Sequence, residues 1–292
     1  MNKNSTLFWS HLKMYEGCPQ KFLWTKGWDG IDLGNGDGRP KTKTEKISAH
    51  HAIMGIAIHH ALEILYNHEL WREGKTLSDK MEEVALKKFE KLIGRMYVDL
   101  DKANMTLDDM REVVRFGARG YVQTMKKNKL LGPYAKSEQK IISWIDQYDS
   151  IGGIIDAIIR RDDTGTMILD GKNAKAKDFV DPDQLVFYAL LYRLAYKKNP
   201  EKVGIIWFRY PYEEGKEETG VTWVDFKDED LTSMAQRVKK AKHAMYKKKF
   251  SAKPSRNSCM FCDYKSECPE RKSELEVKEI SGKGSGFSDF SI

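Results

Sequence analysis

The chain has 292 residues, 40% of them hydrophobic, which is enough for one large domain or for a core domain with an appended subdomain. No apolar run approaches the ~20 residues of a membrane span, and no apolar signal segment follows the first residues, so we expect a soluble, cytoplasmic protein with no membrane partner. A net charge of +7 favours polyanionic partners, nucleic acid first.

The first half of the chain is predicted to be mainly helical. Residues 5–25 carry several aromatic side chains and should dock against the protein, whereas the glycine-rich, charged segment 27–47 has the composition of a mobile loop. Apolar residues at helical spacing then predict helices at about 48–71, 77–98 and 106–128.

The pattern changes after residue 132. Isoleucine-rich stretches bounded by turn residues predict three consecutive antiparallel strands, at 137–147, 150–161 and 166–172. Asp181 and Pro182 have the character of an N-cap and a first-turn proline, which predicts a helix running to about Lys198.

The rest of the chain predicts two strands, one helix and a tail. The strands lie near 203–210 and 220–226, the helix covers 229–249, and the serine- and glycine-rich end over 276–292 is typical of a flexible tail.

Two acidic residues interrupt apolar strands. Asp156 lies in Gly-Gly-Ile-Ile-Asp-Ala-Ile-Ile, and Asp170 lies in Met-Ile-Leu-Asp-Gly-Lys, which also contains Lys172. A buried carboxylate is costly unless it pairs with a base or binds a cation, so an Asp–Lys salt bridge between strands is the simple alternative to a functional site.

The turn between these strands favours the functional interpretation. If Asp163 is the centre of the turn, Asp156 and Asp170 are equally far from it and lie opposite one another, and Lys172 shares their face. Two carboxylates and an ammonium would then meet, and such hard oxygen ligands suit Mg²⁺ or Mn²⁺. A register shifted by one residue would separate them.

Two helical pairs have the same four-residue spacing. Gly55 and His59 lie on one predicted helix, and Gln184 and Tyr188 lie on the helix after the third strand. A single helical histidine is more often structural than a ligand, so these pairs carry weight only in combination.

The four cysteines are Cys18, Cys259, Cys262 and Cys268. A cytoplasmic chain has little reason to form disulfides, and four thiolates can complete either a tetrahedral zinc site or a [4Fe–4S] cluster. Beside them, residues 237–256 contain nine basic and no acidic side chains, a run that is either a solvated surface or a nucleic-acid contact. The candidate DNA-binding residues are Lys239, Lys242, Lys247, Lys248 and Lys249.

In combination, these segments resemble the RecB-like branch of the PD-(D/E)XK nucleases. Four motifs of that branch match in order, and the matched stretch runs from about residue 55 to about residue 190. They are Gly-x-x-x-His at Gly55–His59, Gly-x-x-Asp at Gly153–Asp156, Asp/Glu-x-Lys at Asp170–Lys172 and Gln-x-x-x-Tyr at Gln184–Tyr188. One departure is Asn173-Ala174, where the family often has Thr or Ser followed by Gly.

The resemblance implies an α/β (α+β) restriction-endonuclease-like core, in which helices flank a central mixed sheet. It also implies that Asp156, Asp170, the Gly171 carbonyl and His59 bind Mg²⁺ or Mn²⁺, that Lys172 assists the attacking water, and that Gln184 and Tyr188 position DNA. Glu138 is similar to a less regular upstream glutamate of the branch.

The cysteines extend the resemblance to iron–sulfur nucleases such as the AddB type and CRISPR-associated exonucleases. They imply a [4Fe–4S] cluster that joins both ends of the chain, with Zn²⁺ as the less favoured metal. The expected segments are 1–47 with the first cysteine, the helical region 48–132, the nuclease core 133–250, the cysteine segment 251–275 and the tail 276–292.

The implied activity is a DNA exonuclease of a bacterial or phage-infected cell, acting on single strands or free ends, with possible protein partners in recombination or replication. The alternatives are a structure-specific endonuclease, a non-catalytic DNA-binding protein on a nuclease scaffold, and a zinc-stapled RNA-binding protein. Oligomeric state and polarity do not follow from the sequence.

Overall fold

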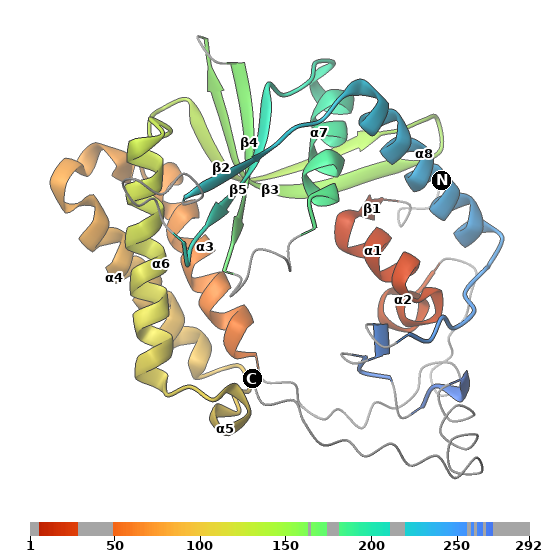
Figure 1. Ribbon diagram of the computed structural model, residues 1–292, viewed down its shortest axis with the longest axis horizontal. Coiled ribbons are helices and arrows are strands. Elements are labelled where there is room, and N and C mark those ends of the chain that lie inside the picture. The colour runs from red at the N-terminus through yellow and green to blue at the C-terminus, as the bar shows by residue number, and fades with distance from the viewer. Residues whose placement is uncertain are drawn as a thin grey trace. The chain divides into compact units, whose positions relative to one another are not determined.

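A computed structural model describes most of the chain, namely residues 6–28, 49–162, 165–173, 181–210, 220–255, 258–259, 262–264 and 267–270. The chain forms two compact units (Figure 1). The larger unit contains Thr6–Trp9 and Lys46–Val238, and the smaller contains Met1–Ser5, Ser10–Glu45 and Lys239–Ile292. The expected tail and most of the expected loop at 27–47 lie outside the described residues.

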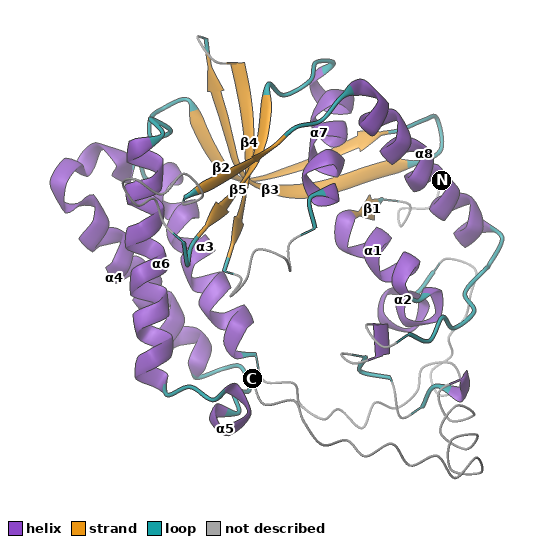
Figure 2. Ribbon diagram, viewed as in Figure 1, coloured by secondary structure: helices purple, strands orange, loops and turns teal. Residues whose placement is uncertain are grey.

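A mixed sheet forms the centre of the larger unit (Figure 2). Its spatial order is β1-β3-β4-β5-β6, with β2 paired to β3. The strands are β1 (Leu7–Phe8), β2 (Ala135–Trp144), β3 (Ser150–Arg161), β4 (Gly165–Lys172), β5 (Lys202–Trp207) and β6 (Val221–Val224). The predicted central mixed sheet flanked by helices is confirmed.

Strand pairing follows the predicted antiparallel order β2, β3, β4. Ala157 pairs with Leu169 and Arg161 with Gly165, which is the register expected from a turn centred on residue 163. The turn residues 163 and 164 themselves lie outside the described part of the chain. The two-residue strand β1, which pairs in parallel with β3, was not predicted because it is too short to show an alternating pattern.

Three long helices of the larger unit pack together beside the sheet (Figure 1). They are α3 (His50–Asn67), α4 (Leu77–Ile93) and α6 (Leu107–Lys127), with the short η1 (Leu70–Thr76) and α5 (Leu100–Ala103) between them. Their buried faces form one core with sheet residues such as Ala157, Ile159 and Leu169. Thr106 and Asp109 form a capping box at the start of α6, which explains why that helix begins there.

The opposite side chains of the strands, such as Ile158 and Ile168, are also buried, because residues alternate between the two faces of a sheet. Helix α7 (Asp183–Tyr196) packs against β2, β3, β4 and β5. The helix begins one residue later than predicted, so Pro182 is the N-cap, and Asp181 Oδ1 accepts a hydrogen bond from the Asp183 N–H of the first turn at 3.0 Å.

The last helix, α8 (Asp228–Tyr246), ends earlier than the predicted residue 249. Its first half belongs to the larger unit, where Arg237 pairs with Asp183 at 2.6 Å and lies over the Trp9 ring. Lys248, just beyond the helix, has a φ of 52° and so cannot continue it.

The smaller unit packs α1 (Trp9–Gly17) and α2 (Pro19–Lys26) against the segment that follows α8. Phe22 stacks on Phe250, Tyr15 contacts both rings edge-on, and the Tyr15 hydroxyl donates to the Lys249 carbonyl at 2.8 Å. The predicted docking of residues 5–25 therefore has a physical basis in an aromatic cluster. Within the described residues, none of the helices is both long enough and apolar enough to span a membrane.

Candidate active site

The site forms where strand β3 separates from β4. The last paired rung is Ala157 with Leu169, and Asp156 is the next residue of β3. Its Oδ2 accepts a hydrogen bond from the Gly171 N–H of β4 at 2.7 Å. A side chain thus replaces the backbone pairing, and it holds the carboxylate at the opening between the two strands.

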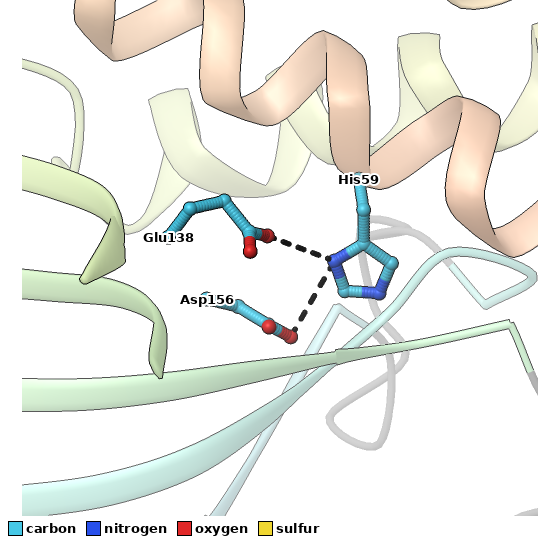
Figure 3. A group of neighbouring side chains, drawn as sticks. All are labelled: His59, Glu138 and Asp156. Atoms are coloured by element: carbon cyan, nitrogen blue, oxygen red, sulfur yellow. Dashed lines mark ion pairs between the residues drawn. The ribbon is translucent and has the colours of Figure 1, made fainter. Parts of the chain in front are cut away.

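His59 and Glu138 lie beside this carboxylate (Figure 3). The His59 Nδ1 is 3.5 Å from Asp156 Oδ2 and 3.7 Å from Glu138 Oε1. His59 comes from the middle of α3, whereas Glu138 lies in β2 between rungs that pair with β3. Among the described residues, these three side chains form a group that could hold a metal ion, because one ligand atom from each lies within 4.8 Å of the other two.

Glu138 has a left-handed backbone conformation, with a φ of 49°. Non-glycine residues rarely adopt this conformation, and such strain occurs most often at functional sites. The sequence indicated Glu138 only through its resemblance to an upstream glutamate, because strand periodicity cannot reveal this local change of direction.

Asp170 lies in a second, connected group with Lys172, Gln184 and Tyr188. The Lys172 ammonium is 2.5 Å from Asp170 Oδ2 and donates to Gln184 Oε1 at 3.0 Å. The Gln184 amide nitrogen lies 3.1 Å from Asp170 Oδ1 and 3.0 Å from the Tyr188 hydroxyl. The Asp–Lys pair is therefore made within one strand rather than between strands, and the four-residue spacing on α7 directs both polar groups toward it.

Glycines allow the elements to approach so closely. A Cβ on Gly171 would overlap the Phe208 ring and lie 3.1 Å from His59 Cε1, so Gly171 borders the histidine directly. A Cβ on Gly153 would come within 3.0 Å of Tyr188 and Leu191. By contrast, a Cβ on Gly55 would meet nothing within 4 Å among the described residues.

The electrostatics of the group are those of a site in which negative charge exceeds positive charge, since among the described residues Asp156, Asp170 and Glu138 face only Lys172 and His59. Burial, and then the charges of Asp170 and Glu138, raise the pKa of Asp156 to about 7 against the effect of His59. Burial also raises the pKa of Asp170, although Lys172 opposes the shift. Burial alone would lower the pKa of His59, but Asp156, Glu138 and Asp170 raise it above its ordinary value.

These donors fit a divalent cation. Carboxylate oxygens and one imidazole are ligands that Mn²⁺ and Mg²⁺ accept, and a cation would relieve the repulsion among three neighbouring acids. Tyr188, whose pKa is raised by burial and then by Asp170, stays protonated and can donate a hydrogen bond.

Asn173, the departure from the family pattern, contacts a residue that sequence reasoning missed. Its Oδ1 accepts a hydrogen bond from Arg209 Nε at 3.2 Å. The Phe208 N–H donates to the Lys172 carbonyl at 3.0 Å, which places Arg209 next to the end of β4. No motif marks Arg209, because the contact depends on the parallel pairing of β4 with β5.

The four cysteines line one pocket of the smaller unit, together with Lys21, Trp24 and Ser258 among others. Ser258 Oγ donates to the Gly17 carbonyl at 3.1 Å, next to Cys18. Burial raises the pKa of Cys262, and the neighbouring Cys18 and Cys259 raise it further, against a backbone hydrogen bond and Lys21. The thiols thus come to one pocket from both ends of the chain, but among the described residues no three of them have their sulfur atoms all within 4.8 Å of one another.

The basic run is divided between surface and interior. Lys239, Lys247, Lys248 and Lys249 are exposed, whereas Lys242 is fully buried. The Lys242 ammonium lies 5.9 Å from the Trp28 ring centre and 5.7 Å from that of Tyr246. A phosphate contact by Lys242 is inconsistent with this burial, which the pattern of charges could not indicate.

A model of the PD-(D/E)XK nuclease superfamily matches residues 8–269, which is most of the chain. The chain belongs to the PD-(D/E)XK nuclease superfamily. PD-(D/E)XK nucleases use divalent metals, so the protein is a metal-dependent nuclease that acts on nucleic acid.

Comparisons with individual proteins add less to the PD-(D/E)XK assignment. No curated protein matches the chain. A match among solved structures is the crystal structure of SSO0001, which is 14% identical over 75% of this chain and 97% of the other, with a TM-score of 0.36.

Proposed function

We propose that the protein is an exonuclease of the RecB-like branch that hydrolyses single-stranded DNA or DNA from a free end. The observation that carries this proposal is the grouping of Asp156 with His59 and Glu138, beside the linked Asp170 and Lys172. A nuclease needs carboxylates for a cation and a basic side chain beside the reacting phosphate, and both occur here where β3 separates from β4.

His59, Glu138, Asp156 and Asp170 would hold the divalent cation, with the Gly171 carbonyl as a further oxygen donor. When bound, such a cation acidifies water and neutralises charge on the scissile phosphate. Mg²⁺ and Mn²⁺ both accept carboxylate oxygens, and the imidazole of His59 favours Mn²⁺.

Lys172 would act on the attacking water or on the charge that grows on the phosphate. Asp170 and Gln184 hold its ammonium between them, so the side chain is fixed before substrate arrives. Gln184 would thereby position Lys172, and the protonated Tyr188 hydroxyl would donate to a phosphate oxygen. The Tyr188 ring is buried, which is inconsistent with the expected stacking on a base.

The cysteines would hold a [4Fe–4S] cluster, with Zn²⁺ as the alternative. Cys18 lies between α1 and α2, whereas Cys259, Cys262 and Cys268 follow α8, so a cluster would tie distant parts of the chain together. Its role would be structural, because cluster binding would contribute to folding of the smaller unit.

The exposed lysines Lys239, Lys247, Lys248 and Lys249 would contact phosphates. The same proposal includes a bacterial or phage origin and partners in recombination or replication. It also includes the division of the chain into segments 1–47, 48–132, 133–250, 251–275 and 276–292.

Linear and circular single-stranded DNA distinguish the activities. With Mn²⁺, end-labelled linear DNA should be degraded to short products, while a covalently closed circle of the same sequence stays intact. Cleavage of the circle would show an endonuclease instead. A protein that binds both substrates but cuts neither with any divalent metal would be a binding protein on a nuclease scaffold.

A further inference from the structure

A basic groove lies between α3 and α4, outside the site described above. Its volume is about 620 Å³, within the range of ligand-binding pockets. The lining residues are four lysines, two histidines, one glutamate and three aliphatic residues: Lys80, Lys87, Lys88, Lys91, His60, His68, Glu83, Ile64, Leu70 and Val84.

Each wall of the groove is one face of a helix. His60 and Ile64 lie four residues apart on α3, and His68 follows as its C-cap, whereas Lys80, Val84, Lys87 and Lys91 recur every three or four residues on α4. Ile64 and Val84 are therefore interleaved with the polar residues along the two walls, and together with Leu70 of η1 they form the apolar strip of the groove. The lining from Lys80 to Lys91 extends along about 16 Å of α4.

The charge of the groove is concentrated at one end. Lys80 is paired with Glu73 at 2.7 Å, but Lys87, Lys88 and Lys91 make no ion pair with any residue that the structure describes. Three neighbouring ammonium groups repel one another, and only Glu83 in the lining offsets them. An anionic ligand would remove that repulsion.

The basic end of the groove is also the end nearest to His59. The Ala49 N–H, at the start of α3, donates to the Tyr97 carbonyl beyond the end of α4 at 2.9 Å, so the two helices run antiparallel. Counting the same number of residues from that contact, forward along α3 and backward along α4, brings His59 level with Lys87. His59 and His60 are adjacent on α3, about 100° apart around it, so the candidate metal site and the groove occupy neighbouring faces of one helix.

We propose that this groove binds the sugar–phosphate backbone of a single strand of the nucleic acid whose scissile phosphate lies at the metal site. This inference rests on the proposed nuclease function. The lysines would contact phosphates, and the apolar strip of Ile64, Leu70 and Val84 would contact sugars or base faces. Such a groove selects for a strand long enough to extend beyond the reacting phosphate.

The test compares binding of long and short strands without cleavage, in the presence of Ca²⁺. Lys87, Lys88 and Lys91 are changed together to Gln, and the matched control changes Lys197, Lys198 and Lys227, which carry equal charge near the ends of other helices. For a single strand of about 20 nucleotides, the groove variant should lower the salt slope by about 2, since each lost phosphate contact removes about 0.7. Over a fourfold rise in salt, the parent should then lose about 20-fold more affinity than the variant.

Two further comparisons distinguish binding in the groove from binding at the catalytic site and from misfolding of the variants. A strand of about 4 nucleotides should bind the parent and the groove variant equally, because it fills only the catalytic site. Glu83→Gln should tighten binding of the long strand, a gain that misfolding cannot produce. An unchanged slope in the groove variant, or an equal loss in the control, would overturn the proposal.

Cleavage assays keep this inference separate from the proposed function. If the parent cuts DNA but the groove variant keeps its full salt slope, the groove inference fails and the nuclease proposal stands. If the parent cuts nothing but the variant loses the slope, the groove is a nucleic-acid site on a protein without the proposed activity.

Discussion

The Asp156 carboxylate accepts a hydrogen bond from the Gly171 N–H at 2.7 Å, one residue beyond the last rung that pairs β3 with β4. This single contact keeps the carboxylate in the opening between the strands, close to His59. It also brings together two motifs that are separate in the sequence, and the first two predictions concern them.

Asp170→Asn and Lys172→Ala should each abolish DNA cleavage while leaving DNA binding nearly intact. In the proposed site, Asp170 would help to hold the cation, and Lys172 would assist proton transfer or charge stabilisation, a contribution of about 10²- to 10⁴-fold in rate. Single-turnover cleavage of labelled single-stranded DNA should be compared with binding in Ca²⁺. Variants that cut as fast as the parent would show that the assigned site is wrong.

Gly171→Ala should lower both stability and divalent-metal affinity. The added Cβ would overlap Phe208 and press on His59, and overpacking of this kind costs about 1–3 kcal/mol. Gly55→Ala is the matched control, because its Cβ would meet no described residue within 4 Å and alanine favours a helix by about 1 kcal/mol. Urea unfolding with and without Mn²⁺ measures both effects, and equal behaviour of the two variants would contradict the packing argument.

Stability of the metal-free protein should fall as pH rises. The pKa of Asp156 is raised from 3.8 to about 7 in the folded state. The stability that protonated Asp156 contributes is therefore complete below pH 3.8 and is lost as the pH rises through about 7. The raised pKa values of Asp170 and His59 act in the same direction.

The melting temperature in the presence of chelator should therefore decrease from about pH 5 to about pH 8. Added Mn²⁺ should raise the melting temperature more at the higher pH. Asp156→Asn should reduce this pH dependence. A melting temperature that rises with pH in the chelated parent would contradict the electrostatic description of the site.

Cys262→Ser should lower the iron content and the melting temperature, because loss of one ligand would weaken the proposed cluster, whose binding would contribute to folding. Anaerobically purified parent should be brown, with a shoulder near ~400 nm. Ser258→Ala, which removes a hydrogen bond from the same pocket but no thiol, should retain its iron. Elemental analysis that finds zinc and no iron in the parent would favour the zinc alternative.

Variants of the basic run should fall into two classes, those that weaken DNA binding and those that lower stability. Changing Lys247, Lys248 and Lys249 to Gln should weaken DNA binding for all sequences and lower its salt slope by about 2 for single strands. Lys242→Gln should instead lower stability, because Lys242 is buried among aromatic rings. A salt slope that the triple variant leaves unchanged would mean that these three lysines are only a solvated surface.

The sequence by itself determined the order of the main strands and helices and the register of β3 against β4, although their pairing ends at Ala157 and Leu169, one rung before Asp156 and Asp170. Both depend on local rules: apolar residues repeat with the period of a helix or strand, and a short turn sets the register of the strands that it joins. The pairing of Gln184 with Tyr188 was likewise predictable, since residues four apart share a helix face.

Only the tertiary structure decided which of these residues touch and which charges are exposed. Glu138 reaches His59 because its backbone leaves the regular strand conformation, and Lys242 is buried because α8 passes beside Trp28. The groove beside Lys87 exists because α3 and α4 run antiparallel, as the bond from Ala49 to Tyr97 shows. Contacts between segments distant in the chain depend on how whole elements pack, and no local period of the sequence records that packing.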